Sequence, residues 1–133
     1  MLTMRCCIAI AIVTTLATGC AQHDPVVSVK GTVTYRGEPV SAGEVTFRYP
    51  ELGRATSAEL ASDGSFELMM PTGHYKVAIL PPRFVGGMDA FGNELSAPPR
   101  PENIPEKYSR IDTSGFKVTV HSKQPNEFTF AIE

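Results

Sequence analysis

The sequence has no tryptophan, only 3 cysteines in 133 residues, and no excess of positive charge. Its 12 lysines and arginines are outnumbered by 14 aspartates and glutamates. No basic field therefore exists to attract phosphate backbones, and we expect no nucleic-acid partner. No apolar run reaches the roughly 20 residues that a membrane-spanning helix needs. A chain of this length supports one domain and leaves no room for a separate catalytic domain.

Sequence motifs for catalysis and for metal binding are also missing. The three histidines, His23, His74 and His121, are far apart in the chain and show no ligand spacing. The nucleophile motif Gly-x-Ser-x-Gly does not occur. A tight turn explains the Asp63-Gly64 pair better than a calcium loop does. We therefore predict no metal site, no cofactor and no catalytic residue.

The first residues, MLTMRCCIAIAIVTTLATGC, have the layout of a secretory signal. One positive charge, Arg5, precedes an apolar run, and small residues follow up to Gly19 and Cys20. We predict that residues 1–19 form a signal peptide. Its removal takes the other two cysteines with it, so Cys20 has no partner for an internal disulfide.

The ending LATGC resembles the lipobox of bacterial lipoprotein signal peptides, in which the cysteine after the cleavage site receives the lipid. The resemblance implies that Cys20 carries several acyl chains, which together form a stable membrane anchor. Residues 20–26 would then be a short lipidated tether. Ala21, in place of an aspartate, favours the outer membrane of the cell envelope over the inner membrane. The alternative is an ordinary exported protein in which Cys20 is a free thiol.

The rest of the sequence alternates with the two-residue period of half-buried strands. Turn-forming glycines and prolines separate the alternating segments, and no helical period follows Cys20. We expect Gly31 to mark a bulge and Asp63-Gly64 to form a tight hairpin turn. The inward-facing residues of the seven expected strands are Val27, Val29, Val33 and Tyr35; Val45, Phe47 and Tyr49; Thr56, Ala58 and Leu60; Phe66, Leu68 and Met70; Tyr75, Val77 and Ile79; Phe116, Val118 and Val120; and Phe128, Phe130 and Ile132.

Short strands with one apolar face each bury those faces by packing as two antiparallel sheets. The motifs GTVTYRGEPVSAGEVTF, SDGSFEL and PTGHYKVAI resemble the carboxypeptidase regulatory-like, or transthyretin-like (prealbumin-like), β-sandwich family. The C-terminal IPEKYSRIDTSGFKVTVHSKQPNEFTFAIE resembles small lipoproteins of planctomycete-type bacteria. Residues 27–133 are therefore expected to form an all-β, seven-stranded antiparallel Greek-key sandwich of transthyretin or Ig type. The motifs are structural and imply no reaction.

A long irregular segment, residues 81–110, interrupts the alternation. Loops of this length inside a compact domain are functional or disordered, and both interpretations stay open. We favour a mobile segment for residues 86–101, after which the chain returns to pack Ile104 and Tyr108 over a sheet edge. In the functional interpretation, large apolar side chains form a contact patch on this Gly/Pro-rich loop. The candidate contact residues are Phe84, Met88, Phe91 and Tyr108.

Together these features favour a non-enzymatic, lipid-anchored β-sandwich of the cell envelope that contacts a protein or a glycan. One alternative is a small hydrolase, because transthyretin-like hydroxyisourate hydrolases have a related fold. Those enzymes share an N-terminal histidine and a C-terminal Tyr-Arg-Gly-Ser, whereas this chain has only His23 in the tether and ends FTFAIE. A carbohydrate-binding module is the other alternative, but its exposed aromatic platforms conflict with the mainly inward positions of the aromatic residues.

Overall fold

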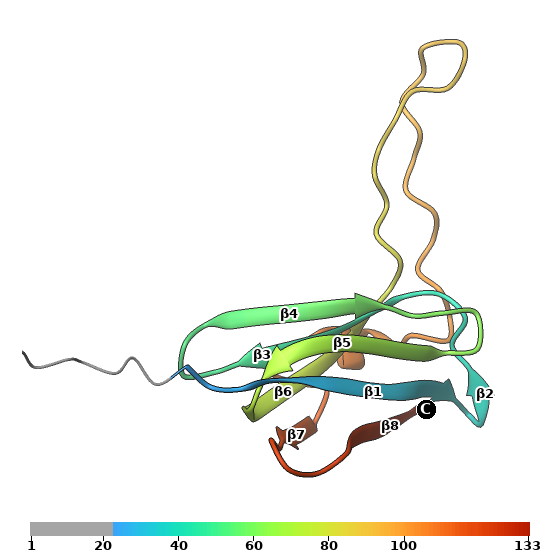
Figure 1. The fold of residues 1–133 in the computed structure, drawn as a ribbon. Helices are drawn as coiled ribbons and strands as arrows, with labels where there is room; N and C mark the ends of the chain where they lie inside the picture. The colour runs from blue at the N-terminus through green and yellow to red at the C-terminus, as the bar shows by residue number, and fades with distance from the viewer. Residues whose placement is uncertain (1–22) are drawn as a thin grey trace, which may run out of the picture.

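The chain forms two β-sheets that pack face to face as a sandwich (Figure 1). The computed structural model describes residues 23–133, so the predicted signal peptide and Cys20 lie outside the described residues. The described part contains a short 3₁₀ helix, η1 (Glu106–Ser109), and no longer helix. Its strands are β1 (Val26–Tyr35), β2 (Glu38–Pro39), β3 (Glu44–Tyr49), β4 (Arg54–Glu59), β5 (Ser65–Pro71), β6 (Gly73–Leu80), β7 (Phe116–Val120) and β8 (Asn126–Ile132).

β1 is the central strand of the first sheet. β8 pairs in parallel with residues 29–35 of β1, and β5 pairs antiparallel with residues 26–32. β2 pairs with residues 34–35, beyond the end of β5. Because Val26 already pairs with Pro71, the sheet begins at the last residue of the predicted tether, one residue before the predicted start of the sandwich domain.

The second sheet has the order β4-β3-β6-β7 and is antiparallel throughout. The predicted all-β sandwich is confirmed, but two details of the prediction are wrong. First, the β1–β8 pair is parallel, because the chain crosses from β7 in the second sheet and starts β8 near the end where β1 starts. Second, there is an eighth strand, β2, formed where Arg36 (φ 49°) and Gly37 (φ 87°) fold the chain straight back onto β1. Two residues are too few to show a period.

Asp63 and Gly64 form the expected tight turn, but the predicted hairpin is wrong. The turn joins β4 at the edge of the second sheet to β5 in the first sheet, so the two strands it links are not paired with each other. Gly64 has φ 77°, and the Asp63 carboxylate accepts hydrogen bonds from the backbone N–H (3.0 Å) and the hydroxyl of Ser65. Turn chemistry is local, whereas the sheet that the next strand joins depends on the whole core.

Gly31 lies in an unbroken stretch of β1, so the predicted bulge is wrong as well. A Cβ at this position would lie 1.9 Å from the carbonyl oxygen of Phe128 and 2.8 Å from Cζ of Phe66. Glycine is therefore required because β8 and an aromatic ring approach β1 too closely for any side chain.

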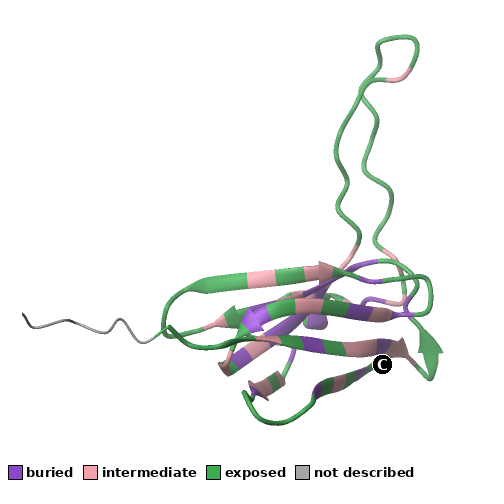
Figure 2. Cartoon of the chain, in the orientation of Figure 1, coloured by how far each residue is buried: buried purple, intermediate pink, exposed green. Residues whose placement is uncertain are grey.

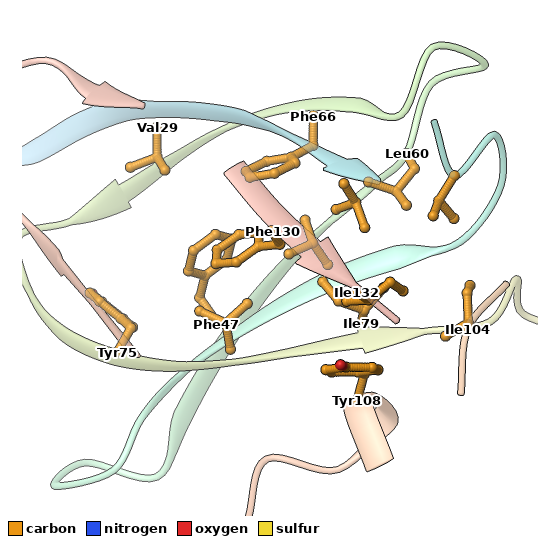
Figure 3. Packing of buried hydrophobic residues seen from close by; sticks show 14 of the residues in the cluster. Val29, Phe47, Leu60, Phe66, Tyr75, Ile79, Ile104, Tyr108, Phe130 and Ile132 are labelled. Atoms are coloured by element: carbon orange, nitrogen blue, oxygen red, sulfur yellow. The ribbon is translucent and has the colours of Figure 1, made fainter. Parts of the chain in front are cut away.

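The core lies between the two sheets, as the burial colours in Figure 2 show. None of the residues predicted to face inward is exposed, which confirms the strand faces. Phe47 is fully buried at the centre, with its ring centroid 5.9 Å from that of Phe66, 6.3 Å from that of Phe130 and 6.4 Å from that of Tyr75 (Figure 3). Tilted and edge-on aromatic pairs of this kind add to the stabilisation from burial.

Candidate functional site

Residues 82–100, here called the arm, project from the sandwich between β6 and η1 (Figure 1). Every residue of the arm is exposed except Asp89, which is half-buried (Figure 2). Prolines occur in both legs, at Pro82 in the ascending leg and at Pro98 and Pro99 in the descending leg. Proline removes a backbone donor and favours extended backbone of about 3.1 Å per residue, so each leg, residues 82–86 or 96–100, reaches on the order of 15 Å.

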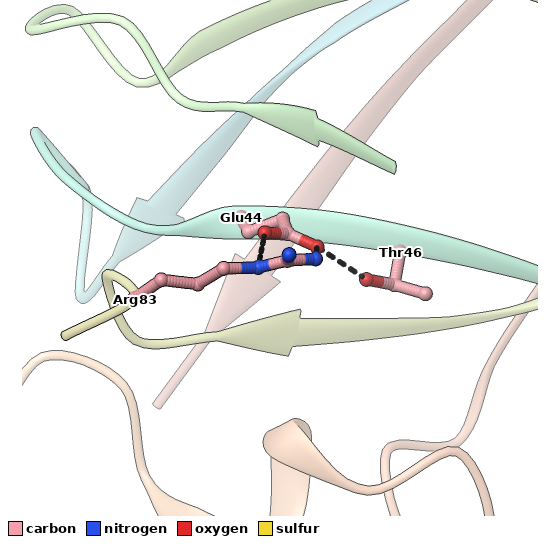
Figure 4. Close-up of polar contacts among 3 residues, drawn as sticks. All are labelled: Glu44, Thr46 and Arg83. Carbon is pink, nitrogen blue, oxygen red and sulfur yellow. Dashed lines mark hydrogen bonds and ion pairs between the residues drawn. The ribbon is translucent and has the colours of Figure 1, made fainter. Parts of the chain in front are cut away.

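A salt bridge fastens the ascending leg to the sandwich at its base (Figure 4). Nε and Nη2 of Arg83 donate to the two carboxylate oxygens of Glu44, at 2.8 and 2.9 Å. The Glu44 side chain is only 10% exposed and also accepts a hydrogen bond from Thr46. The hydrogen bonds from Arg83 lower the pKa of Glu44, and they outweigh desolvation, which raises it. The carboxylate is therefore charged at neutral pH, and the ion pair joins the ascending leg to β3.

The descending leg is fastened by a second arginine and by the returning chain. Nη1 of Arg100 donates to the hydroxyl of Ser109 at 2.7 Å. Ile104 is fully buried and Tyr108 is 9% exposed, which confirms the predicted return to the sandwich. The ring of Tyr108 stacks on Phe116 with centroids 5.6 Å apart. Tyr108 is therefore a packing residue, and its assignment to the contact loop is wrong.

The tip of the arm, residues 87–95, is a turn built around the carboxylate of Asp89. Oδ1 accepts the backbone N–H groups of Phe91 at 2.8 Å and of Asn93 at 2.9 Å, and Oδ2 accepts the Asn93 side-chain amide at 2.9 Å. These hydrogen bonds lower the pKa of Asp89, and those from Asn93 have the largest effect. The backbone N–H of Leu95 closes the turn by donating to Gly87 at 2.7 Å. The tip thus has local structure within the segment that we expected to be mobile, and motion of the arm as a whole stays a prediction.

The arm carries a concentration of exposed apolar side chains. Phe91 is 90% exposed at the tip, where no other side chain covers its ring, and Val85 is 85% exposed. The exposed large hydrophobic residues of the arm are Phe84, Val85, Met88, Phe91 and Leu95. Three of the four predicted contact residues thus lie together on one projecting element, while the fourth, Tyr108, lies in the core.

Sequence reasoning missed the residues that shape the arm. Glu44 and Arg83 are 39 positions apart, and no local pattern indicates that they pair. Asp89 is different, because the stretch DAFGN contains the turn formers aspartate, glycine and asparagine within five residues. That signal was present in the sequence and identifies the tip.

His74 and His121 take part in hydrogen bonds at or next to the β6–β7 pair. His74 shares a 2.8 Å hydrogen bond with the hydroxyl of Thr119 across the β6–β7 pair. His74 is exposed and Thr119 is half-buried. The backbone N–H of His121 donates to the side-chain oxygen of Asn126 at 2.7 Å, and the backbone carbonyl of His121 accepts a hydrogen bond from the Asn126 amide at 2.8 Å. Among residues 23–133 no three His, Cys, Asp or Glu residues are grouped closely enough to hold a metal ion.

The fold and the arm define the class of this protein: an all-β sandwich with one projecting loop that is apolar at its tip. Within residues 23–133, no helix has the length and apolar character needed to cross a membrane. No protein-family model and no curated protein matches the chain.

Among solved structures, the chain is similar to a DUF3823 family protein from Parabacteroides merdae, at 15% identity and a TM-score of 0.47, over 83% of this chain and 47% of that one. A DUF3823 family protein from Bacteroides ovatus matches at 17% identity and a TM-score of 0.42, over 81% of this chain and 44% of that one. A leucine-rich repeat protein from Bacteroides thetaiotaomicron matches at 15% identity and a TM-score of 0.40, over 81% of this chain and 12% of that one. The chain thus spans less than half the length of each of these structures.

Proposed function

We propose that this protein is a non-enzymatic, lipid-anchored β-sandwich of the cell envelope that uses its arm to bind a protein partner. The observation that carries the proposal is the exposed apolar set on the arm, with Phe91 at 90% exposure. Clustered apolar side chains on a soluble surface mark interaction sites, whereas single exposed ones need no explanation.

The anchoring of the arm supports a binding role. An arm that served only as a spacer between β6 and η1 would need neither the Arg83–Glu44 salt bridge at its base nor the hydrogen-bonded turn at Asp89. Both features limit the conformations of the arm before a partner arrives. Preorganisation of this kind lowers the entropy cost of binding.

A protein partner fits the arm better than a glycan does. Carbohydrate sites use flat aromatic faces beside polar groups, whereas three of the five exposed apolar side chains of the arm are not aromatic, namely Val85, Met88 and Leu95. Phe91 is the one aromatic residue at the tip, and Phe84, nearer the base, is 42% exposed. Methionine and phenylalanine side chains on a projecting loop instead fit an apolar pocket on a protein, with Phe91 as the central anchor.

The lipid anchor and the family relation complete the proposal. The lipobox-like LATGC and the unpaired Cys20 support acylation, and Ala21 favours the outer membrane. The motifs around Gly31, Gly64 and Tyr75 support a relation to carboxypeptidase regulatory-like, transthyretin-like domains. The mass of the N-terminal peptide from the native host tests the anchor: diacylglyceryl and acyl mass on Cys20 supports it, and an unmodified thiol contradicts it.

The arm is tested by site-specific photo-crosslinking in the native host. A photoreactive residue replaces Phe91 in one variant and Thr129, on the exposed face of β8, in a matched control. We expect a discrete protein adduct at position 91 and none at position 129. Equal adducts at both positions would contradict a specific site on the arm.

Affinity for the purified partner then measures the role of single side chains. If Phe91 is the anchor, Phe91→Ala weakens binding by about 30-fold or more, which corresponds to roughly 2 kcal/mol. Thr129→Ala leaves affinity unchanged. Unchanged affinity in Phe91→Ala would reduce the arm to a spacer, and glycan binding that is lost in Phe91→Ala would replace the protein partner with a carbohydrate.

A further inference from the structure

The exposed large hydrophobic residues of residues 23–133 fall in only two places. Five lie on the arm, and the other three are Val26 (56% exposed), Leu52 (60%) and Met69 (61%). Val26 begins β1, Leu52 lies in the loop between β3 and β4, and Met69 lies near the end of β5. These three residues belong to one end of the sandwich, here called the entry end, where the described chain enters the fold.

Strand register shows that the entry end and the base of the arm are at opposite ends of the sandwich. Val26 pairs with Pro71, and β6 begins two residues later at Gly73. β6 then runs the length of the second sheet to Leu80, which pairs with Glu44. The arm leaves the fold directly after Leu80, as Figure 1 shows.

Leu52, one of the three apolar residues, lines a small hollow at the entry end. The hollow has a volume of about 180 Å³, and Leu52 and Pro71 line it together with Tyr49 and Tyr75. Asp24 and Arg54 also line it and carry opposite charges, so the hollow has no net charge from its lining. On the outer face of the first sheet, Val26 and Met69 are diagonal neighbours, because Val26 pairs with Pro71 and Ser28 pairs with Met69.

The chain that precedes β1 holds this end close to Cys20. The carbonyl of Pro25 accepts the backbone N–H of Thr72 at 3.1 Å, which fixes Pro25 against the turn between β5 and β6. Only residues 21–24 separate Cys20 from this point. At about 3.5 Å per extended residue, the sulfur of Cys20 lies within roughly 20 Å of the entry end.

We propose that the entry end rests on the lipid surface, with Leu52 inserted at the boundary between headgroups and acyl chains and with Val26 and Met69 beside it. This inference rests on the proposed acylation of Cys20, because the short tether then brings the entry end to the membrane. The balanced charge of Asp24 and Arg54 indicates apolar insertion rather than attraction to anionic headgroups. The base of the arm, at the other end of the sandwich, is then held away from the membrane, and the arm projects sideways from the sheets (Figure 1).

The test uses the processed, full-length lipoprotein in vesicles made of equal parts phosphatidylethanolamine and phosphatidylglycerol. Leu52→Cys places a thiol for an environment-sensitive fluorophore at the entry end, and Phe91→Cys is the matched control on the arm. Both residues are exposed, so neither substitution empties the core. Acylation blocks the thiol of Cys20, and the other two native cysteines leave with the signal peptide, so the introduced cysteine takes the label.

We expect the emission of the label at position 52 to shift to the blue in vesicles. We also expect a spin label on the lipid headgroup region to quench it several-fold more strongly than the label at position 91. Met69→Cys is a second reporter and should be quenched as well.

Equal, weak quenching at positions 52, 69 and 91 would overturn the proposal. A blue shift that needs no vesicles and grows with protein concentration would also overturn it, in favour of a second copy covering the entry end. Two labels per chain would show that Cys20 is not acylated, which is a failure of the proposed anchor and is seen separately in the labelling stoichiometry.

Discussion

Phe47 and Phe91 are the same residue type in opposite surroundings, with 0% and 90% of their surface exposed. Phe47 lies in a sandwich whose longer strands bury one face, so that its side chain packs among other buried apolar side chains. Phe91 lies on an arm whose backbone shows no alternation and whose side chains face solvent. The sandwich is stabilised by burial, whereas the arm keeps its shape through prolines, one salt bridge and one turn.

This difference shows how one small chain separates stability from recognition. A substitution in the sandwich lowers the free energy of unfolding, because the core is close-packed and a smaller side chain loses packing contacts there. Substitution of an exposed apolar side chain on the arm leaves that free energy almost unchanged and acts on whatever the arm binds. The following predictions compare the two regions, starting with the largest effect.

Phe66→Ala should destabilise the protein by about 3 to 5 kcal/mol. The ring of Phe66 is 4% exposed, stacks on Phe130 at 6.0 Å and covers the glycine position of β1. Its loss leaves a cavity at the centre of the sandwich, and since small domains have only 5 to 15 kcal/mol of total stability the variant is close to unfolding. Urea denaturation followed by circular dichroism measures the change. A midpoint equal to that of the wild type would contradict the strand assignment.

Gly31→Ala should cost about 3 kcal/mol, at the upper end of the range for overpacked sites. The added methyl group meets the carbonyl of Phe128, and this backbone group moves only if the β1–β8 pairing is disturbed. Gly86→Ala is the matched control on the arm, where the nearest atom, in the Phe84 ring, lies 3.8 Å from the new Cβ. The control should be neutral or slightly stabilising, since alanine restricts the unfolded chain. Equal effects of the two substitutions would show that β8 does not approach β1 as described.

Arg83→Ala should destabilise the protein by about 1 to 3 kcal/mol at neutral pH, because it leaves the mostly buried carboxylate of Glu44 without its main partner. The folded-state pKa of Glu44 is lowered, so its contribution is complete above the unfolded pKa of about 4.3 and is lost as pH falls through the folded pKa. The difference between wild type and variant should therefore shrink below about pH 4. Denaturation curves across the acid range measure it.

Arg83→Lys is the control for this prediction, since it keeps the positive charge and loses the two-pronged hydrogen bonding. We expect the stability of Arg83→Lys to lie between that of the wild type and that of Arg83→Ala. A loss that is the same at every pH would contradict the assignment of the effect to Glu44.

The sequence predicted the sandwich well and the arm poorly, and the reason is the range of the interactions. The alternation in β3 or β6 reports burial residue by residue, so the inward positions of Phe47 and Tyr75 were correct. The parallel pairing of β8 and the close approach at Gly31 depend on a partner strand almost 100 residues away, which no local pattern encodes. On the arm, the salt bridge of Arg83 joins residues 39 positions apart, which is also beyond any local pattern. Tyr108 was misplaced because an apolar residue in a loop shows no period that would tell packing from exposure.

Phe91→Ala should have the smallest effect on folding, within about 0.5 kcal/mol of the wild type. Its ring is 90% exposed and has no aromatic partner among the described residues, so truncation removes almost no buried surface. The same urea titration used for Phe66→Ala checks it. A loss above 1 kcal/mol would mean that the tip packs against the sandwich and that the exposed arm is the wrong description. A neutral result makes Phe91→Ala a clean probe of recognition, since any loss of binding then comes from the contact itself.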